Sequence, residues 1–260
     1  MSHERGPEHA ELLQEGLFRM VEVHHPGRER SRVRRPRRLD LDLVVFDMDG
    51  TLVEGSSWEI VHRHFGVSNQ KNWERYCLGE LDDLEFMRTD IALWMQDGKQ
   101  VHISDVERIF DHVHPFPGVA DLVEKLHEQG VGTLIMSGGL DLLARRVCEL
   151  TGIERYVANG FHLTEAGLLS GEGQCFVKIN DKGTPTREAL KRLGVDPRRV
   201  AAVGNTRYDI PMFRECGYAV AFNPEDEEVK AAADAVVVER DMRLILPHLE
   251  AYRAPRDRRE

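Results

Sequence analysis

From residue 44 onward, short apolar runs rich in β-branched residues alternate with segments of helical periodicity. The clearest runs span residues 44–46, 131–136, 200–203, 219–222 and 235–238. Runs this short that are apolar throughout predict strands buried on both faces. Helices between such strands cover the two faces of a parallel sheet through right-handed crossovers. The chain is therefore predicted to be α/β, with a doubly wound, mostly parallel sheet and a Rossmann-like core.

The first of these runs ends in two acids, Asp47 and Asp49, followed by Gly50 and Thr51. Ligands of open α/β sheets bind outside the carboxyl ends of the strands, which is where these acids fall. Residues two apart on an extended backbone point to the same side, so the two carboxylates lie close together and repel each other. A divalent cation or a proton would offset that repulsion. The alternative is an Asp-Gly turn that only redirects the chain.

The second run, residues 131–136, ends in Ser137, Gly138 and Gly139, and we expect a tight turn there. A helix is predicted to follow from Leu140 or Asp141. A small polar turn at a helix N-terminus favours anions, because backbone N–H groups point outward there and the helix dipole is positive. A βα loop that uses its glycines only for geometry is the alternative.

Two more polar segments lie downstream. Lys182 stands just before a predicted helix that Thr184 would cap, and a lone lysine in such a loop is normally a solvated surface group. Asn205 and Asp209 follow the buried run 200–203, so they are expected at the same edge of the sheet as the first two motifs.

Residues 55–114 lack strand signals and read as a small helical insert. Apolar residues recur at helical spacing in four segments, 58–65, 72–77, 83–96 and 104–112. Arg88 lies off the apolar face of the third segment and is a candidate for gripping a phosphate or carboxylate, with an ordinary surface arginine as the alternative. The insert also holds four histidines, which could bind a metal but lack a metal-site spacing, and packed or exposed histidines are the alternative: His62, His64, His112 and His114.

Residues 1–40 differ from the rest of the chain. Apolar residues between positions 12 and 20 predict one or two helical turns, and a strongly basic run follows at 28–38. We interpret this region as a solvated, poorly ordered basic extension appended to the core. An anion-binding or nucleic-acid-binding arm is the alternative.

Composition excludes several classes of protein. The formal net charge of −10 over 260 residues argues against general nucleic-acid binding, which needs basic surface. No stretch is apolar for long enough to span a membrane, and the N-terminus lacks the apolar core of a signal peptide. Four scattered cysteines without a CxxC pair favour a reduced chain, so we expect a cytoplasmic protein.

The order and spacing of the four polar motifs resemble the haloacid dehalogenase-like hydrolase superfamily, and most closely its phosphoserine phosphatase-like branch. The resemblance covers roughly residues 41–250. It implies a hydrolase core formed by residues 41–54 and 115–252, and it identifies residues 55–114 with that branch's small helical cap.

The resemblance also implies a reaction, the hydrolysis of a small phosphorylated metabolite through an aspartyl-phosphate intermediate. Asp47 would be the nucleophile, and Asp49 would protonate the leaving oxygen and then activate water. Mg²⁺ would offset the negative charge. The implied metal ligands are Asp47, Asp49 through its backbone carbonyl, Asn205 and Asp209. The implied phosphate- and substrate-binding set, with Thr51 supporting the first loop, is Thr51, Ser137, Gly138, Gly139 and Lys182. Arg88 joins this set as a candidate from its own position in the insert and not from the resemblance.

The sequence departs from the branch pattern at three positions. Asn205 stands where the branch has an aspartate metal ligand, so we expect weaker metal binding rather than none. Tyr208 replaces an asparagine, and Ser56 replaces the glutamate that phosphoserine-specific members carry, so phosphoserine is a candidate substrate only. Two alternatives remain: a catalytically weakened ligand-binding or regulatory protein of the same fold, and a phosphotransferase or mutase.

Overall fold

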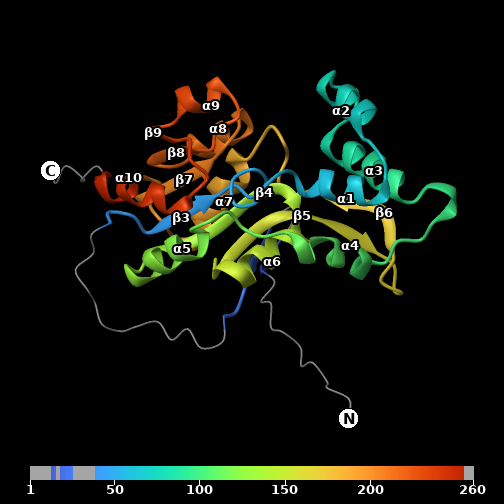
Figure 1. Ribbon diagram of the computed structural model, residues 1–260, viewed down its shortest axis with the longest axis horizontal. Helices are drawn as coiled ribbons and strands as arrows, with labels where there is room; N and C mark the ends of the chain where they lie inside the picture. Colours follow the sequence, from blue (N-terminus) through green and yellow to red (C-terminus); the bar gives the residue numbers. More distant parts are fainter. Residues whose placement is uncertain (1–12, 16–17, 26–38, 255–260) are drawn as a thin grey trace, which may run out of the picture.

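A single β-sheet forms the centre of the computed structural model, which describes residues 13–15, 18–25 and 39–254 (Figure 1). The strands follow the order β1-β2-β5-β4-β3-β7-β8-β9, and β6 pairs with β5 outside this path. The strands are β1 (Leu13–Glu15), β2 (Phe18–Glu22), β3 (Leu43–Phe46), β4 (Gly132–Leu140), β5 (Arg155–Leu163), β6 (Leu169–Gln174), β7 (Val200–Gly204), β8 (Tyr218–Phe222) and β9 (Ala235–Val237). The strands from β5 to β9 along that path pair in parallel, while β1, β2 and β6 join antiparallel, so the predicted mostly parallel sheet is confirmed.

Helices lie on both faces of this sheet. They are α1 (Ser57–Phe65), α2 (Gln70–Cys77), α3 (Asp83–Trp94), α4 (Ile103–Ile109), α5 (Val119–Glu128), α6 (Asp141–Thr151), α7 (Gly183–Leu193), α8 (Ile210–Phe213), α9 (Glu227–Ala232) and α10 (Leu246–Ala251). In Figure 1, α5 and α6 lie on the opposite side of the strands from α8 and α9. The doubly wound α/β class predicted from the alternating pattern is therefore confirmed.

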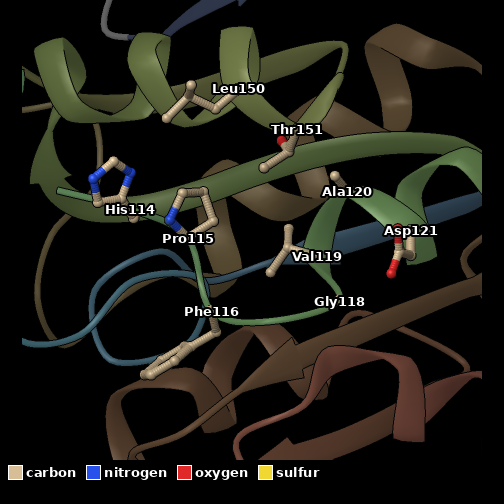
Figure 2. Close-up of a pocket in the computed structure, with 9 residues that line it drawn as sticks. All are labelled: His114, Pro115, Phe116, Gly118, Val119, Ala120, Asp121, Leu150 and Thr151. Atoms are coloured by element: carbon tan, nitrogen blue, oxygen red, sulfur yellow. The ribbon is translucent and has the colours of Figure 1, made fainter.

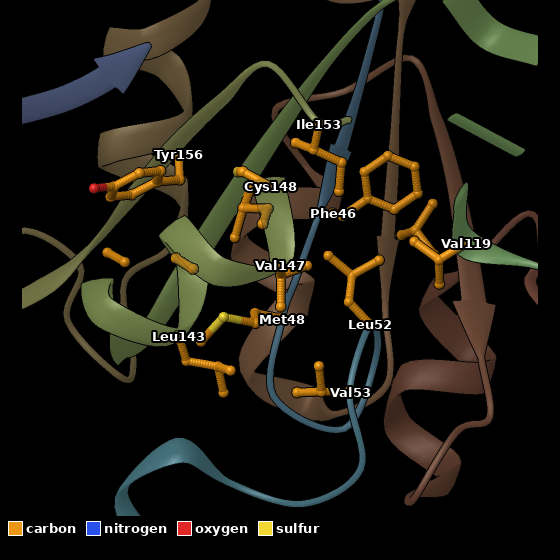
Figure 3. Packing of buried hydrophobic residues seen from close by; sticks show 14 of the residues in the cluster. Phe46, Met48, Leu52, Val53, Val119, Leu143, Val147, Cys148, Ile153 and Tyr156 are labelled. Atoms are coloured by element: carbon orange, nitrogen blue, oxygen red, sulfur yellow. The ribbon is translucent and has the colours of Figure 1, made fainter. Parts of the chain in front are cut away.

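The central strand β3 shows why both faces need helices. Its side chains alternate, so Val44 and Phe46 enter the hydrophobic cluster that includes α5 and α6, whereas Leu43 and Val45 enter the cluster that includes α7 and α8. Figure 3 shows the first cluster around Phe46. All of β3 is buried, which fixes its end, and the acids that follow, at the centre of the sheet.

The helices α1 to α4 follow β3 and precede α5 in the chain. In Figure 1 they form a lobe on the opposite side of the molecule from β8 and β9. The four helices predicted between residues 58 and 112 are present, with somewhat different ends. Gly66 ends α1 in a left-handed conformation, and Asp82 with Glu85 forms a capping box at the start of α3. Buried His62 bonds Asp90 through Nε2 at 3.1 Å and accepts a bond from the indole N–H of Trp94 at 2.8 Å, so this histidine joins α1 to α3.

The prediction of helical turns near residues 12–20 is wrong for the residues described there. Leu13–Glu15 and Phe18–Glu22 are antiparallel strands, and Val21 pairs with Tyr156 of β5. Met20 and Val21 are buried, so β2 belongs to the hydrophobic core and is no appendage to it. The basic run at 28–38 lies outside the described residues.

Within the described residues, no helix is long and apolar enough to cross a membrane. All four cysteines are free thiols.

Candidate active site

The polar tips of three strands meet at one edge of the sheet. Phe46 at the end of β3 pairs with Ile135 of β4 on one side and with Val203 of β7 on the other. After β3 the chain builds outward to β4 and β5, and it then returns across β3 to build β7, β8 and β9. This reversal of strand order is where open α/β sheets bind ligands.

Lys182 connects two of the predicted acids. Its Nζ donates to Oδ1 of Asp47 and to Oδ1 of Asp209, each at 2.6 Å, and all three side chains are buried. Burial and the neighbouring Asp209 raise the pKa of Asp47, although Lys182 opposes the rise. Burial alone would lower the pKa of Lys182, but Asp209 and Asp47 outweigh it and raise that pKa. The lysine is therefore a fixed positive charge between two carboxylates, unlike a solvated loop lysine.

Asp49 has different surroundings. Its Oδ2 accepts bonds from the backbone N–H of Ser57 at 2.9 Å and from the Ser57 hydroxyl at 2.8 Å. Its Oδ1 is shielded from solvent and has no hydrogen-bond partner. Burial raises the pKa of Asp49 to about 6, although the two bonds from Ser57 oppose the rise. This carboxyl group can therefore gain and lose a proton near neutral pH.

Thr51 and Asn205 join the first loop to the last. The Thr51 hydroxyl lies 3.0 Å from Asn205 Oδ1 and 3.4 Å from Asp47 Oδ2. Gly50 has φ of 79°, and a Cβ there would lie 2.2 Å from Asn205 Nδ2. Only glycine allows the two loops to approach this closely.

Asp209 holds the loop that carries Asn205. Its Oδ2 accepts from the backbone N–H groups of Asn205 at 2.8 Å and Thr206 at 3.0 Å, while its Oδ1 accepts from Lys182. Because both oxygens already have partners, the geometry favours Asp209 as an anchor rather than as the direct metal ligand that the sequence implied.

The segment Ser137-Gly138-Gly139 differs from the predicted tight turn. β4 continues through it to Leu140, with a register shift against β5, and α6 begins only at Asp141. The bond from Gly139 N–H to Ser137 Oγ, at 3.1 Å, shapes the segment locally. Asn159 of β5 fixes it from outside by donating to Gly138 O at 3.0 Å.

This segment also touches the first motif. A Cβ on Gly139 would lie 2.6 Å from Asp49 Oδ2 and 2.6 Å from Ser57 Oγ. The Ser57 hydroxyl in turn accepts from the backbone N–H of Leu140 at 3.0 Å. Ser57 therefore ties Asp49 to the end of β4.

The lobe of α1–α4 packs over these loops. Trp73 of α2 meets the ring of Tyr208 edge to face, with 6.3 Å between centroids. The Tyr76 hydroxyl accepts from Asn180, two residues before Lys182, at 3.0 Å. The lobe thus contacts the chain next to Asp209 and close to Lys182, where it can limit access of bulk water.

Arg88 is not part of this cluster. Its guanidinium Nε lies 2.9 Å from each carboxylate oxygen of Glu172 on β6, and both side chains are about half exposed. In this structure Arg88 lies on the surface in an ion pair with Glu172, as the surface-arginine alternative describes.

Two concave surfaces elsewhere on the described part of the chain lack this chemistry. A cavity of about 320 Å³ lies beside α5 and the end of α6, and Asp121 is its only acidic lining residue (Figure 2). Another of about 470 Å³ lies in the helical lobe and is lined by His64, Phe65, Lys99, Asp105, Arg108, Ile109 and His112. Neither contains a predicted catalytic residue.

Sequence reasoning missed three residues of the site. Ser57 directly follows the expected specificity position, Ser56, and no role in the site is predicted for it from the sequence. Asn159 lies inside a strand of the hairpin and carries no motif. Glu225 accepts from Asn205 Nδ2 at 3.0 Å and lies in an acidic stretch that carries no recognised motif. Their contacts come from tertiary structure, so no local spacing could have indicated them.

The oxygen atoms at this edge suit a hard divalent cation. Asp47 and Asp209 both accept from Lys182, and Asp49 adds a carboxylate whose Oδ1 has no hydrogen-bond partner among the described residues. Within the described part of the chain, no three His, Cys, Asp or Glu side chains converge as a ready-made metal cage. Mg²⁺ fits such a site, because it is usually held by one or two carboxylates together with water and substrate phosphate.

Comparison with known proteins identifies relatives over most of the chain. A family model described as haloacid dehalogenase-like hydrolase matches residues 41–217. The phosphoserine phosphatase of Methanocaldococcus jannaschii is 28% identical over 80% of this chain and 97% of its own length, and that of Albidiferax ferrireducens is 30% identical over 72% and 81%. A solved structure described as a phospho-aspartyl intermediate analogue of phosphoserine phosphatase matches 80% of this chain and 98% of its own, with 27% identity and a TM-score of 0.67.

Proposed function

This chain belongs to the haloacid dehalogenase-like hydrolase family and is a phosphatase, and on that premise we propose that it hydrolyses phosphoserine, or a closely similar small phosphomonoester, with Mg²⁺. The observation that carries the proposal is the contrast between two neighbouring carboxyl groups. Asp47 is held by Lys182, whereas Asp49 is held by Ser57 with its other oxygen unpartnered. Two acids with different surroundings can divide nucleophile and acid–base roles.

Asp47 is the nucleophile in this proposal. One of its carboxylate oxygens forms a bond to phosphorus while the bond from phosphorus to the ester oxygen breaks. Lys182 fixes Oδ1 at 2.6 Å. Among the described residues Oδ2 has only the 3.4 Å contact with Thr51, so Oδ2 is the oxygen available to attack. The product of this step is an aspartyl-phosphate and a free alcohol.

Asp49 moves the protons. In the first step its carboxyl proton goes to the departing ester oxygen, so the alcohol leaves neutral. In the second step the carboxylate takes a proton from water, and the water oxygen attacks phosphorus and releases phosphate from Asp47. A pKa of about 6 suits both roles at neutral pH.

The residues present fit a divalent cation, and phosphatases of this family are in general metal-dependent. Asp47, the backbone carbonyl of Asp49 and the amide oxygen of Asn205 would hold it. When bound, the cation offsets the negative charge shared by Asp47 and the phosphoryl oxygens.

In this proposal, hydrogen-bond donors of the protein that are already in position bind the phosphoryl oxygens of the substrate. Ser137 Oγ accepts from Gly139 N–H, which leaves the hydroxyl hydrogen of Ser137 free to donate to substrate. Lys182 adds a fixed positive charge next to Asp47. Preorganised donors of this kind stabilise the charge that spreads over the phosphoryl group in the transition state.

The substrate proposal is tested with a panel of phosphomonoesters. Its support is the phosphoserine phosphatases of similar sequence and a solved structure, 27% identical to this chain, that is described as a substrate-bound phosphoserine phosphatase complex. Phosphate release would be measured with Mg²⁺ and again with EDTA, across phosphoserine, phosphothreonine, sugar phosphates and an aryl phosphate. We expect cation-dependent release that is fastest with phosphoserine. Faster release from a phosphomonoester without an amino acid group would overturn the phosphoserine assignment. This comparison matters because Ser56 stands where phosphoserine-specific members carry glutamate.

A further inference from the structure

The side-chain amide of Asn205 is held at both ends. Its Nδ2 donates to Glu225 Oε1 at 3.0 Å, and its Oδ1 accepts from the Thr51 hydroxyl at 3.0 Å. An amide group has one donor end and one acceptor end, so a carboxylate at one end fixes which atom faces the other way. Glu225 therefore determines that the oxygen of Asn205 faces Thr51 and the Asp47 side of the site.

The contact between Asn205 and Glu225 is built into the backbone as well. Glu225 N–H donates to Asn205 O at 2.8 Å, so the loop after β8 is attached directly to the loop after β7. The Glu225 carboxylate also reaches the first loop, because Oε1 lies 3.2 Å from the position that a Cβ on Gly50 would take. Three loops thus bring this carboxylate beside the proposed cation ligands.

We infer that Glu225 is a positioning residue for the cation site, orienting the Asn205 amide oxygen and supplying the negative charge that this chain lacks at position 205. The inference rests on the proposed function, since it concerns the proposed cation. It reverses part of the sequence-based expectation of weak metal binding, because the missing negative charge is present on Glu225, which is hydrogen-bonded to the Asn205 side chain.

The two contributions of Glu225 predict different effects of substitution. In Glu225→Gln the charge is lost, and the glutamine amide can face Asn205 with either end, so the Asn205 oxygen is no longer fixed. Partners of metal ligands that are altered in this way typically cost about 10–100-fold in metal affinity. In Asn205→Asp with Glu225→Gln the charge and the amide exchange places, so a carboxylate faces the site again.

The test is a titration with Mn²⁺ alone, in which electron paramagnetic resonance measures the free aqueous ion, so turnover is not the readout. We expect Glu225→Gln to bind Mn²⁺ about 10-fold or more weakly than the unaltered chain, and the double variant to recover to within about 3-fold. Glu227→Gln is the matched control, because it removes one carboxylate from the same segment where the side chain is 87% exposed. That control should bind like the unaltered chain.

The outcomes separate this inference from the proposed function. Equal Mn²⁺ affinity in Glu225→Gln and the unaltered chain would overturn the role of Glu225 and leave the metal-dependent reaction standing. A double variant as weak as Glu225→Gln would also overturn it, since charge would not be what Glu225 supplies. Absence of Mn²⁺ binding in the unaltered chain would overturn the proposed cation itself.

Discussion

Replacing Asp49 with asparagine should make the folded protein more stable while it removes activity. Asparagine has the same shape, and its amide oxygen can keep both bonds from Ser57. The amide nitrogen would take the place of Oδ1, which has no hydrogen-bond partner. The change therefore removes a buried charge at little cost in packing.

The magnitude follows from the pKa of Asp49, which burial raises from 3.8 to about 6. A raised pKa means that ionisation is less favourable in the folded state than in the unfolded chain. The Asp49 carboxyl therefore has no destabilising effect below its unfolded-state pKa. As the pH rises towards 6 it lowers the free energy of unfolding progressively, and above that pH the loss is constant. Two units correspond to about 3 kcal/mol at neutral pH. An unpartnered amide N–H costs about 1–2 kcal/mol of this, so we expect a net gain of about 1–2 kcal/mol.

Urea denaturation in EDTA at pH 7.5 and pH 4.5 measures the effect. The advantage of Asp49→Asn should shrink by about 2 kcal/mol at the lower pH, because most Asp49 side chains of the unaltered folded protein are then protonated. Asp121→Asn is the control, since the Asp121 side chain is 62% exposed and its surface ion pair with Arg243 contributes little to the free energy of unfolding. An advantage that is absent at pH 7.5, or equal at both pH values, would refute the reasoning.

Three other substitutions or deletions test the geometry around this group. Ser57→Ala should lower kcat by about 10–100-fold and shift to higher pH the part of the pH–rate profile that reports the ionisation of Asp49. Ser57→Thr should keep both near normal. An unshifted profile in Ser57→Ala would contradict the role of Ser57. Gly139→Ala should cost about 100-fold in activity with the fold retained, because its Cβ would lie 2.6 Å from Asp49 Oδ2; normal activity would show that this approach is not needed. Deleting residues 1–25 should lower the free energy of unfolding by about 3–5 kcal/mol, since β2 buries two core side chains. An unchanged urea midpoint would show that β2 does not stabilise the core.

The sheet and most of the catalytic cluster could be predicted from the sequence because their signals are local. A buried strand requires an unbroken apolar run, and a site at its end requires polar residues directly after that run. Asp47, Lys182 and Asp209 each follow this pattern or lie next to a helix start, and the structure brings them within hydrogen-bond distance.

The errors occurred where structure depends on residues far along the chain. β2 is a strand because it pairs with Arg155 and Tyr156, while its own apolar spacing also fits a helix. Arg88 is held by Glu172, a partner 84 residues away. Contacts of this kind leave no mark in a local window of sequence.

The measurement that tests the central claim most directly is chemical trapping of the covalent intermediate. The enzyme would be mixed with phosphoserine and Mg²⁺, quenched in acid within one turnover, reduced with borohydride and mapped by peptide mass spectrometry. Reduction converts an aspartyl-phosphate to homoserine, so the account predicts homoserine at position 47 and none in a sample without substrate. Homoserine at another aspartate, or turnover of an Asp47→Asn variant at the normal rate, would contradict it.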